Sequence, residues 1–314
     1  MGGTKYAKAV AAIKAMENYF LTHNDIEQLI NASGKSEMDS VLASKKGNGN
    51  ETDSLENVWA TIMDYAPECK ELKILLYKND FHNLKAALKS MIAGREPDSY
   101  YIKPSNIELS ELKDILSSKE YERLPEYMRS TAEEAYKLIT KTLDGQLADS
   151  LIDCDALKAM QKAAEKTKSS FMIKYALLNT VCADIKTAYR CCKMKKSMSF
   201  METAICGSSE LEKDSLVRAA MGGMETLTSY LENSSYGDAA RLLEKSTAQF
   251  EKWCDDVITE LAEQARMQSF GFEPLAAYYI AAEAEIKNLR ILSICKEFGA
   301  DRETVTERMR KLYV

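Results

Sequence analysis

The acidic stretch CDDVITE, residues 254–260, comes nearest to a catalytic motif in its residue types and spacing. Asp256 and Glu260 lie four residues apart, so on a helix their carboxylates share one face. With Asp255 beside them, they resemble the magnesium-binding helices of isoprenoid-synthase-like enzymes that use diphosphate substrates. Such an enzyme needs a second acidic cluster and basic residues for the diphosphate, and no matching motif is visible. A solvated acidic helix face is therefore favoured, and the magnesium-dependent enzyme is the alternative.

The string SGKSE at 33–37 is similar to the end of a phosphate-binding loop. The full pattern requires a glycine five residues before Gly34, after a strand. Leu29 occupies that position, inside a helical pattern. An ordinary helix-ending glycine is the better interpretation, and we predict no nucleotide site here.

Histidine and cysteine chemistry finds little support. His23 and His82 are the only histidines, and neither has the glutamate three residues earlier that di-iron helical bundles use. The eight cysteines form no C-x-x-C pair and fall mostly inside helical apolar patterns, so we expect reduced thiols that pack as small hydrophobes. The sequence therefore predicts no catalytic residue, no metal site and no cofactor.

Composition limits the class of protein. The chain has 314 residues, of which 46% are hydrophobic, and its formal net charge is -6. A negative net charge disfavours nucleic acid as a partner, because binding depends on neutralising phosphates. No signal peptide and no run of about 20 apolar residues is visible, so we expect a cytoplasmic protein that does not insert into a membrane.

The elements that position these residues are predicted to be helices. Apolar residues recur at three-and-four spacing from Tyr6 onward, and only 13 Gly and 5 Pro are present, too few for a fold with many turns. Helix signals include a cap at Thr22 or Asn24, a closing Gly94 and Gly299 followed by a capping Asp301. The stretch SKKGNGNETDS at 44–54 is predicted to be an exposed loop, and residues 210–232 are predicted to form one helix. The fold class is all-α.

Three similar strings recur along the chain. They are NDFHNLK at 79–85, ADIKTAYR at 183–190 and EAEIKNLR at 283–290. Asp80, Asp184 and Glu285 align at a spacing of about 100 residues, the size of one compact domain. Prolines near 97–104 and the GSS at 207–209 provide boundaries. We predict three similar helical domains, at 1–105, 106–208 and 209–314.

The strings DFHNLKAALK at 80–89, YYIAAEAEIKNLR at 278–290 and ERMRKLYV at 307–314 resemble the family of C subunits of V-type and archaeal-type (V/A-type) ATPases and ATP synthases. This family is related to the d subunit of eukaryotic vacuolar ATPases. The resemblance covers essentially the whole chain. The middle string and the opening YAKAVAAIKA depart from the family pattern.

The resemblance implies a non-catalytic subunit made of three similar domains around a pseudo-threefold axis, shaped like a funnel. Such a protein lies on the cytoplasmic side of the membrane, peripherally, between the central stalk and the membrane rotor ring. It transmits torque for ion transport and needs no cofactor. Its expected partners are the stalk and ring subunits of the same ATPase.

The repeated strings supply the candidate interface or inter-domain residues. We predict that each domain uses the same helix to pack against its neighbours, with polar side chains fixing the register; direct contact with the stalk is the alternative. Glu283, Lys287 and Arg290 share one helix face by their spacing. The full set is Asp80, Asn83, Lys85, Asp184, Glu283, Glu285, Lys287, Asn288 and Arg290.

Overall fold

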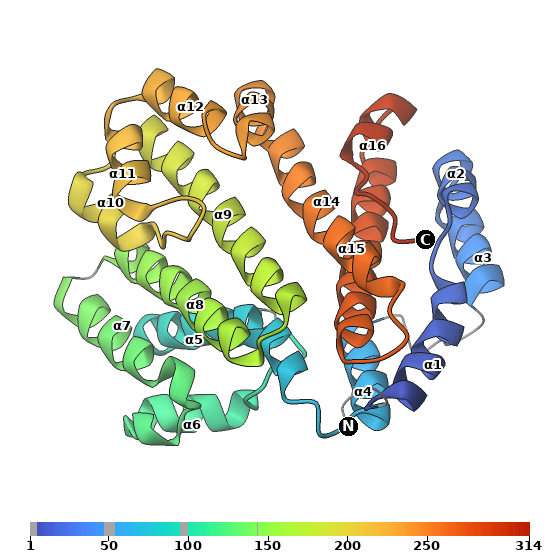
Figure 1. Cartoon of the computed structure of the whole chain (residues 1–314), viewed down its shortest axis with the longest axis horizontal. Helices are drawn as coiled ribbons and strands as arrows, with labels where there is room; N and C mark the ends of the chain where they lie inside the picture. Colours follow the sequence, from blue (N-terminus) through green and yellow to red (C-terminus); the bar gives the residue numbers. More distant parts are fainter. Residues whose placement is uncertain (1–4, 47–53, 95–99, 143) are drawn as a thin grey trace. The chain divides into compact units, whose positions relative to one another are not determined.

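A computed structural model describes residues 5–46, 54–94, 100–142 and 144–314. All regular secondary structure in these ranges is helical, which confirms the predicted all-α class (Figure 1). The chain separates into two compact units. Unit 1 joins both ends of the chain, Met1–Leu72 and Leu242–Val314, and unit 2 is Lys73–Arg241. The predicted division into three domains at 1–105, 106–208 and 209–314 concerns repeated modules and stays a prediction.

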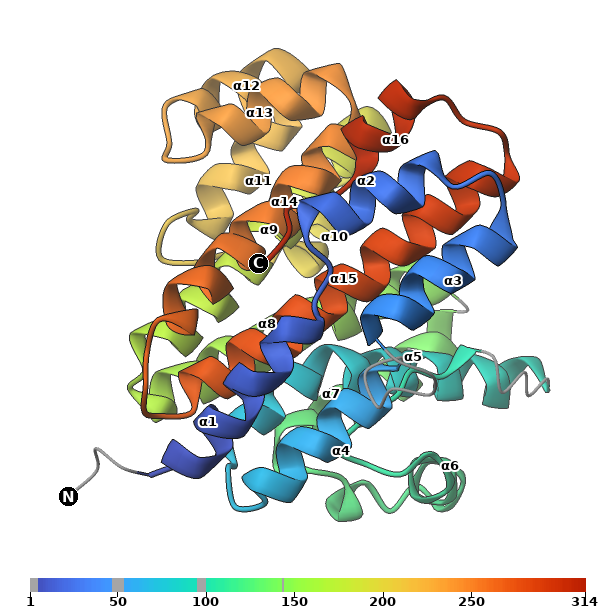
Figure 2. The same cartoon turned by 90° about the vertical axis from the view of Figure 1, so that its right-hand side faces the viewer.

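Unit 1 is organised around the long helix α15. Its helices are α1 (Ala7–Met16), α2 (His23–Asn31), α3 (Lys35–Lys46), α4 (Leu55–Tyr65), α14 (Thr247–Arg266), α15 (Glu273–Glu297) and α16 (Arg302–Arg308). Figure 2 shows the N-terminal helices α2 and α3 beside the C-terminal helices α15 and α16. The first part of α15, residues 274–282, is buried on all sides, as expected for a helix without a polar face there.

Unit 2 packs around α8. Its helices are α5 (Tyr77–Ala93), α6 (Leu109–Ser118), α7 (Arg129–Thr142), α8 (Gly145–Thr167), α9 (Ser170–Lys193), α10 (Met198–Ala204), α11 (Lys213–Met221) and α12 (Met224–Glu232). Helix α13 (Gly237–Lys245) contains the boundary at which unit 1 resumes, since unit 2 ends at Arg241. Across both units the described residues also form short 3-10 helices: η1 (Glu17–Tyr19), η2 (Glu71–Leu76), η4 (Tyr121–Arg123) and η5 (Glu126–Met128). Helices α5, α7, α9 and α10 all pack against α8.

The predicted helix ends are found where local chemistry sets them. Thr22 caps α2 in a reciprocal box with Asp25, and Asp301 caps α16 by accepting the Thr304 N–H at 2.7 Å. Gly94 and Gly299 follow α5 and α15 in the left-handed conformation, at φ 61° and 65°. These sequence predictions are confirmed because capping depends on residues within one turn of each other.

Two local predictions need correction. The expected loop at 44–54 begins too early, because residues 44–46 belong to α3 and Lys46 is buried; most of the remaining loop, 47–53, lies outside the described residues. A single helix expected over 210–232 is divided into α11 and α12 at Gly222 and Gly223, where Gly223 has φ 100°. In the described ranges, none of the helices combines the length and apolarity that crossing a bilayer requires.

Candidate functional site

The three predicted carboxylates are buried within long helices. Asp80 lies in α5, Asp184 in α9 and Glu285 in α15, with exposed fractions of 0%, 1% and 7%. A buried carboxylate costs free energy unless hydrogen-bond donors surround it. The groups that donate hydrogen bonds to each carboxylate therefore show which segment of the chain it holds.

Asp80 holds the segment that leads into α6. It accepts the Asn106 backbone N–H and the Asn106 side-chain amide, both at 2.7 Å, and the Tyr127 hydroxyl at 2.6 Å. Burial raises the pKa of Asp80, and these donors oppose the rise by stabilising the carboxylate. The nearby Asn79 also donates to the Pro104 carbonyl at 2.9 Å. The segment 104–106 is thus fixed to α5.

Asp184 holds the turn after α10 in the same manner. It accepts backbone N–H groups from Cys206 at 2.8 Å and from Gly207 at 2.7 Å. Burial raises the pKa of Asp184 to about 6, against the stabilising effect of the two N–H groups. Gly207 has φ 83°, and a Cβ there would lie 2.7 Å from the Lys213 Cβ. Only glycine fits this turn without strain.

Glu285 joins the two ends of the chain. It accepts the Leu21 backbone N–H and the Lys46 ammonium, each at 2.5 Å. Leu21 directly precedes the cap of α2, and Lys46 ends α3. Both side chains of the Lys46–Glu285 ion pair are more than nine-tenths buried. The N-terminal helices are thereby attached to α15.

Asn83 and Asn288 make matching contacts. Asn83 accepts the Ile102 N–H at 2.8 Å and donates to the Ile102 carbonyl at 2.9 Å. Asn288 accepts the Arg310 N–H at 2.7 Å and donates to the Arg310 carbonyl at 3.1 Å. In both cases one amide satisfies both backbone groups of one residue in a later non-helical segment.

The remaining predicted residues lie closer to the surface. Lys85 pairs with Asp153 at 2.6 Å, and Lys287 pairs with Asp255 at 2.5 Å. Glu283 is partly buried, and Arg290 is exposed without an ion-pair partner among the described residues. The role of the predicted set as interface or inter-domain residues stays a prediction.

The acidic stretch at 254–260 anchors the C-terminal segment. Arg310 donates to Asp255 at 2.8 Å, and the Lys311 N–H donates to Asp256 at 2.6 Å. The Lys311 ammonium lies 3.4 Å from Glu260. In the described ranges, no group of three or more His, Cys, Asp or Glu side chains could hold a metal ion. Two cations and one backbone N–H of the chain itself contact these carboxylates, which does not favour a diphosphate-magnesium site.

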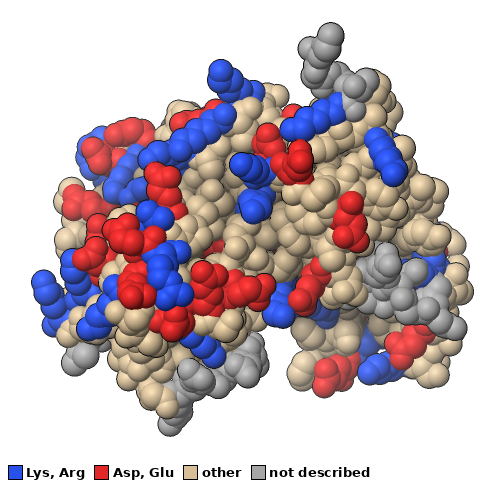
Figure 3. Space-filling view, turned by 90° about the horizontal axis from the view of Figure 1, so that it is seen from below, with Lys and Arg blue, Asp and Glu red and all other residues tan. Residues whose placement is uncertain are grey.

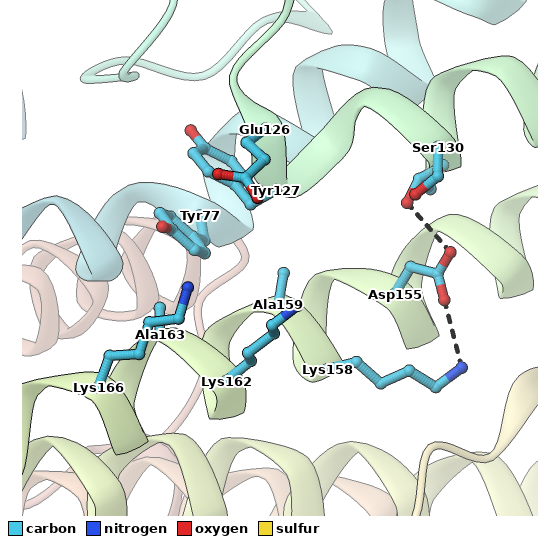
Figure 4. Close-up of a pocket in the computed structure, with 11 residues that line it drawn as sticks. Tyr77, Glu126, Tyr127, Ser130, Asp155, Lys158, Ala159, Lys162, Ala163 and Lys166 are labelled. Atoms are coloured by element: carbon cyan, nitrogen blue, oxygen red, sulfur yellow. Dashed lines mark hydrogen bonds and ion pairs between the residues drawn. The ribbon is translucent and has the colours of Figure 1, made fainter.

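Sequence reasoning missed a hollow in unit 2. It has a volume of about 340 Å³ between α5, η5, α7 and α8 (Figure 4). Lys158, Lys162 and Lys166 line it from one face of α8, opposite the stacked rings of Tyr77 and Tyr127. The spacing of four residues in LKAMQKAAEKTK is a signal that could have indicated this row.

Charges of both signs are intermixed on the face that Figure 3 draws, and neither forms one continuous field. The net charge of -6 therefore says little about any single contact surface. Local rows such as the α8 lysines carry more information about partners.

The fold and the candidate residues define a class of helical protein in which buried polar side chains hold the chain's own backbone segments. The chain belongs to the ATP synthase (C/AC39) subunit family, whose model matches residues 9–308. The C subunit of the V-type sodium ATPase of Enterococcus hirae is 25% identical over 325 residues, covering 98% of this chain and 99% of that protein. The family expected from the sequence is confirmed. The chain is a non-catalytic accessory subunit of a V-type ATPase complex.

Proposed function

We propose that this protein couples the central stalk of a rotary ATPase to the membrane rotor ring and transmits torque between them. It would lie peripherally on the cytoplasmic side of the membrane, without inserting into it. ATP chemistry and ion translocation would belong to other subunits. The observation that carries the proposal is the family match over residues 9–308, together with a V-type ATPase relative aligned over nearly its whole length.

The hydrogen bonds and packing inside the chain support the role of a rigid subunit that resists twisting. Asp80, Asp184 and Glu285 each fix a backbone segment to a long helix by direct hydrogen bonds. Buried polar contacts of this kind specify one arrangement, because any shift leaves a donor or acceptor unsatisfied. Close packing around α8 and α15 adds low compressibility. A torque-transmitting adapter needs both properties.

We also propose that the chain consists of three similar modules around a pseudo-threefold axis, in a funnel-shaped arrangement. The repeated contacts support it: Asp80 holds the segment before α6, and Asp184 holds the segment before α11. Glu285 holds Leu21, just before α2, near the start of the chain. If the three modules form a closed ring, the long helix of the last module, α15, would contact the segment before α2 in the first module, as Glu285 and Leu21 do.

The test compares membranes from cells with and without this chain. We expect ATP hydrolysis by the headpiece to persist without it, while ATP-driven ion uptake into vesicles is lost. An affinity-tagged chain should bring down headpiece and ring subunits from native membranes. Full coupling of hydrolysis to ion uptake in its absence would contradict the proposal. Complementation with the wild-type chain serves as the control.

A further inference from the structure

The α8 lysine row contains two charges that no ion pair among the described residues neutralises. Lys158 has a partner in Asp155 at 3.3 Å, whereas Lys162 and Lys166 have no ion-pair partner among the described residues. All three side chains are exposed at the hollow. The lining also contains two carboxylates, Glu126 and Asp155, so the three lysines leave a formal excess of one positive charge.

The walls of the hollow give the row a defined setting. The rings of Tyr77 and Tyr127 are stacked 3.9 Å apart, and Tyr127 is held by its hydrogen bond to Asp80. On the other side, Thr131 donates to Asp155 at 3.0 Å, which orients the partner of Lys158. The lysines therefore face side chains that other contacts within the fold already hold in place.

The geometry of the row favours an elongated anionic partner. Four-residue spacing places the first and last lysine about 12 Å apart along α8. Figure 4 shows the side chains spreading, with Lys158 directed to Asp155 and Lys166 directed toward Tyr77. A single phosphate is bound by donors that converge on one point. Spread ammonium groups instead match carboxylates distributed along a protein segment.

We propose that Lys158, Lys162 and Lys166 form a docking surface for an acidic segment of the central stalk. This inference rests on the proposed coupling function and adds to it the chemistry of one contact. The partner segment presents two or three carboxylates at helical spacing, and the Tyr77–Tyr127 wall receives an adjoining apolar side chain. Because the lysines are exposed, the contact contributes orientation and association rate, and it weakens as salt is added.

The experiment measures binding of the full-length chain to the purified central-stalk complex by calorimetry at low and high salt. The test variant is Lys158→Gln, Lys162→Gln, Lys166→Gln. The control variant, Lys119→Gln, Lys137→Gln, Lys141→Gln, removes the same charge from exposed lysines of unit 2 outside the hollow. We expect the test variant to bind roughly tenfold more weakly with a smaller salt dependence, and the control to stay within about twofold.

Other results of these measurements would contradict the docking surface or assign the lysine row another role. Equal binding by both variants would overturn the docking surface and leave the coupling function intact, whereas no binding by the wild-type chain would overturn both. The chain alone is also titrated with inorganic phosphate and with ATP. Phosphate or ATP binding that only the test variant loses would assign the row to a small anion. A thermal unfolding shift confined to the test variant would assign it to a contact within the chain.

Discussion

Lys46 and Glu285 form a buried ion pair, 2.5 Å long, between the end of α3 and the middle of α15. We expect Lys46→Met to leave Glu285 as an uncompensated buried charge and to lower the free energy of unfolding by about 3–5 kcal/mol. Chemical denaturation measures the change. Adding Glu285→Gln to the Lys46→Met variant should recover part of the loss.

The matched control for that pair is the neighbouring Lys45, which pairs with Asp25 at 3.2 Å in a more exposed position. Lys45→Met should cost about 1 kcal/mol, less than Lys46→Met, because water still reaches both side chains of this pair and screens it. Equal losses for the two lysine variants would mean that burial of the Glu285 pair has no special energetic role.

The pH dependence of stability tests Asp184. Burial raises its pKa to about 6, so the folded protein binds this proton more tightly than the unfolded chain, in which an aspartate titrates near pH 4. The group therefore favours folding at pH below about 4, and that contribution is lost as pH rises through about 6. This pKa shift makes the free energy of unfolding on the order of 3 kcal/mol larger below pH 4 than above pH 6.

Asp184→Asn should remove this component and flatten the pH profile of the urea midpoint between pH 4 and 7. Asp184→Asn should also lower the free energy of unfolding, because one of the two N–H groups loses its acceptor. Asp153→Asn is the control, since that carboxylate is 61% exposed in its pair with Lys85. A wild-type and an Asp184→Asn profile with the same slope would refute the assignment.

The paired asparagines predict equal local effects at distant positions in the sequence. Asn83→Ala and Asn288→Ala should each lower stability by about 2 kcal/mol, because both backbone groups of one residue lose their partner. Hydrogen exchange provides the local readout. The Ile102 amide should exchange faster in the first variant, and the Arg310 amide in the second. Unchanged protection of these amides would show that the contacts do not persist in solution.

Gly207 is expected to resist substitution. Gly207→Ala places a Cβ 2.7 Å from the Lys213 Cβ at a positive φ, so we expect a loss of about 1–3 kcal/mol, measured by thermal unfolding. Gly34 has open space around its Cβ position and is the control. Gly34→Ala should be neutral or slightly stabilising. A neutral Gly207→Ala would mean that the turn can move away from Lys213.

Much of the fold followed from short-range patterns in the sequence. The spacing of apolar residues predicted helices, and Thr22, Asp301, Gly94 and Gly299 predicted four of their ends. These features depend on groups a few residues apart, so the sequence contains the whole interaction. The repeated strings aligned Asp80, Asp184 and Glu285, and the structure shows that all three are buried.

The partners of those residues depended on tertiary structure. Glu285 meets Leu21 and Lys46 across sequence separations of 264 and 239 residues, and no local pattern could indicate this. For the same reason Lys46 looked like part of an exposed loop, and Asp255 looked like part of a free acidic face. The sequence alone determined the helices and the family, because both rest on residue order. Which charges are neutralised, and which lysines of α8 remain open to a partner, was decided only when distant segments packed together.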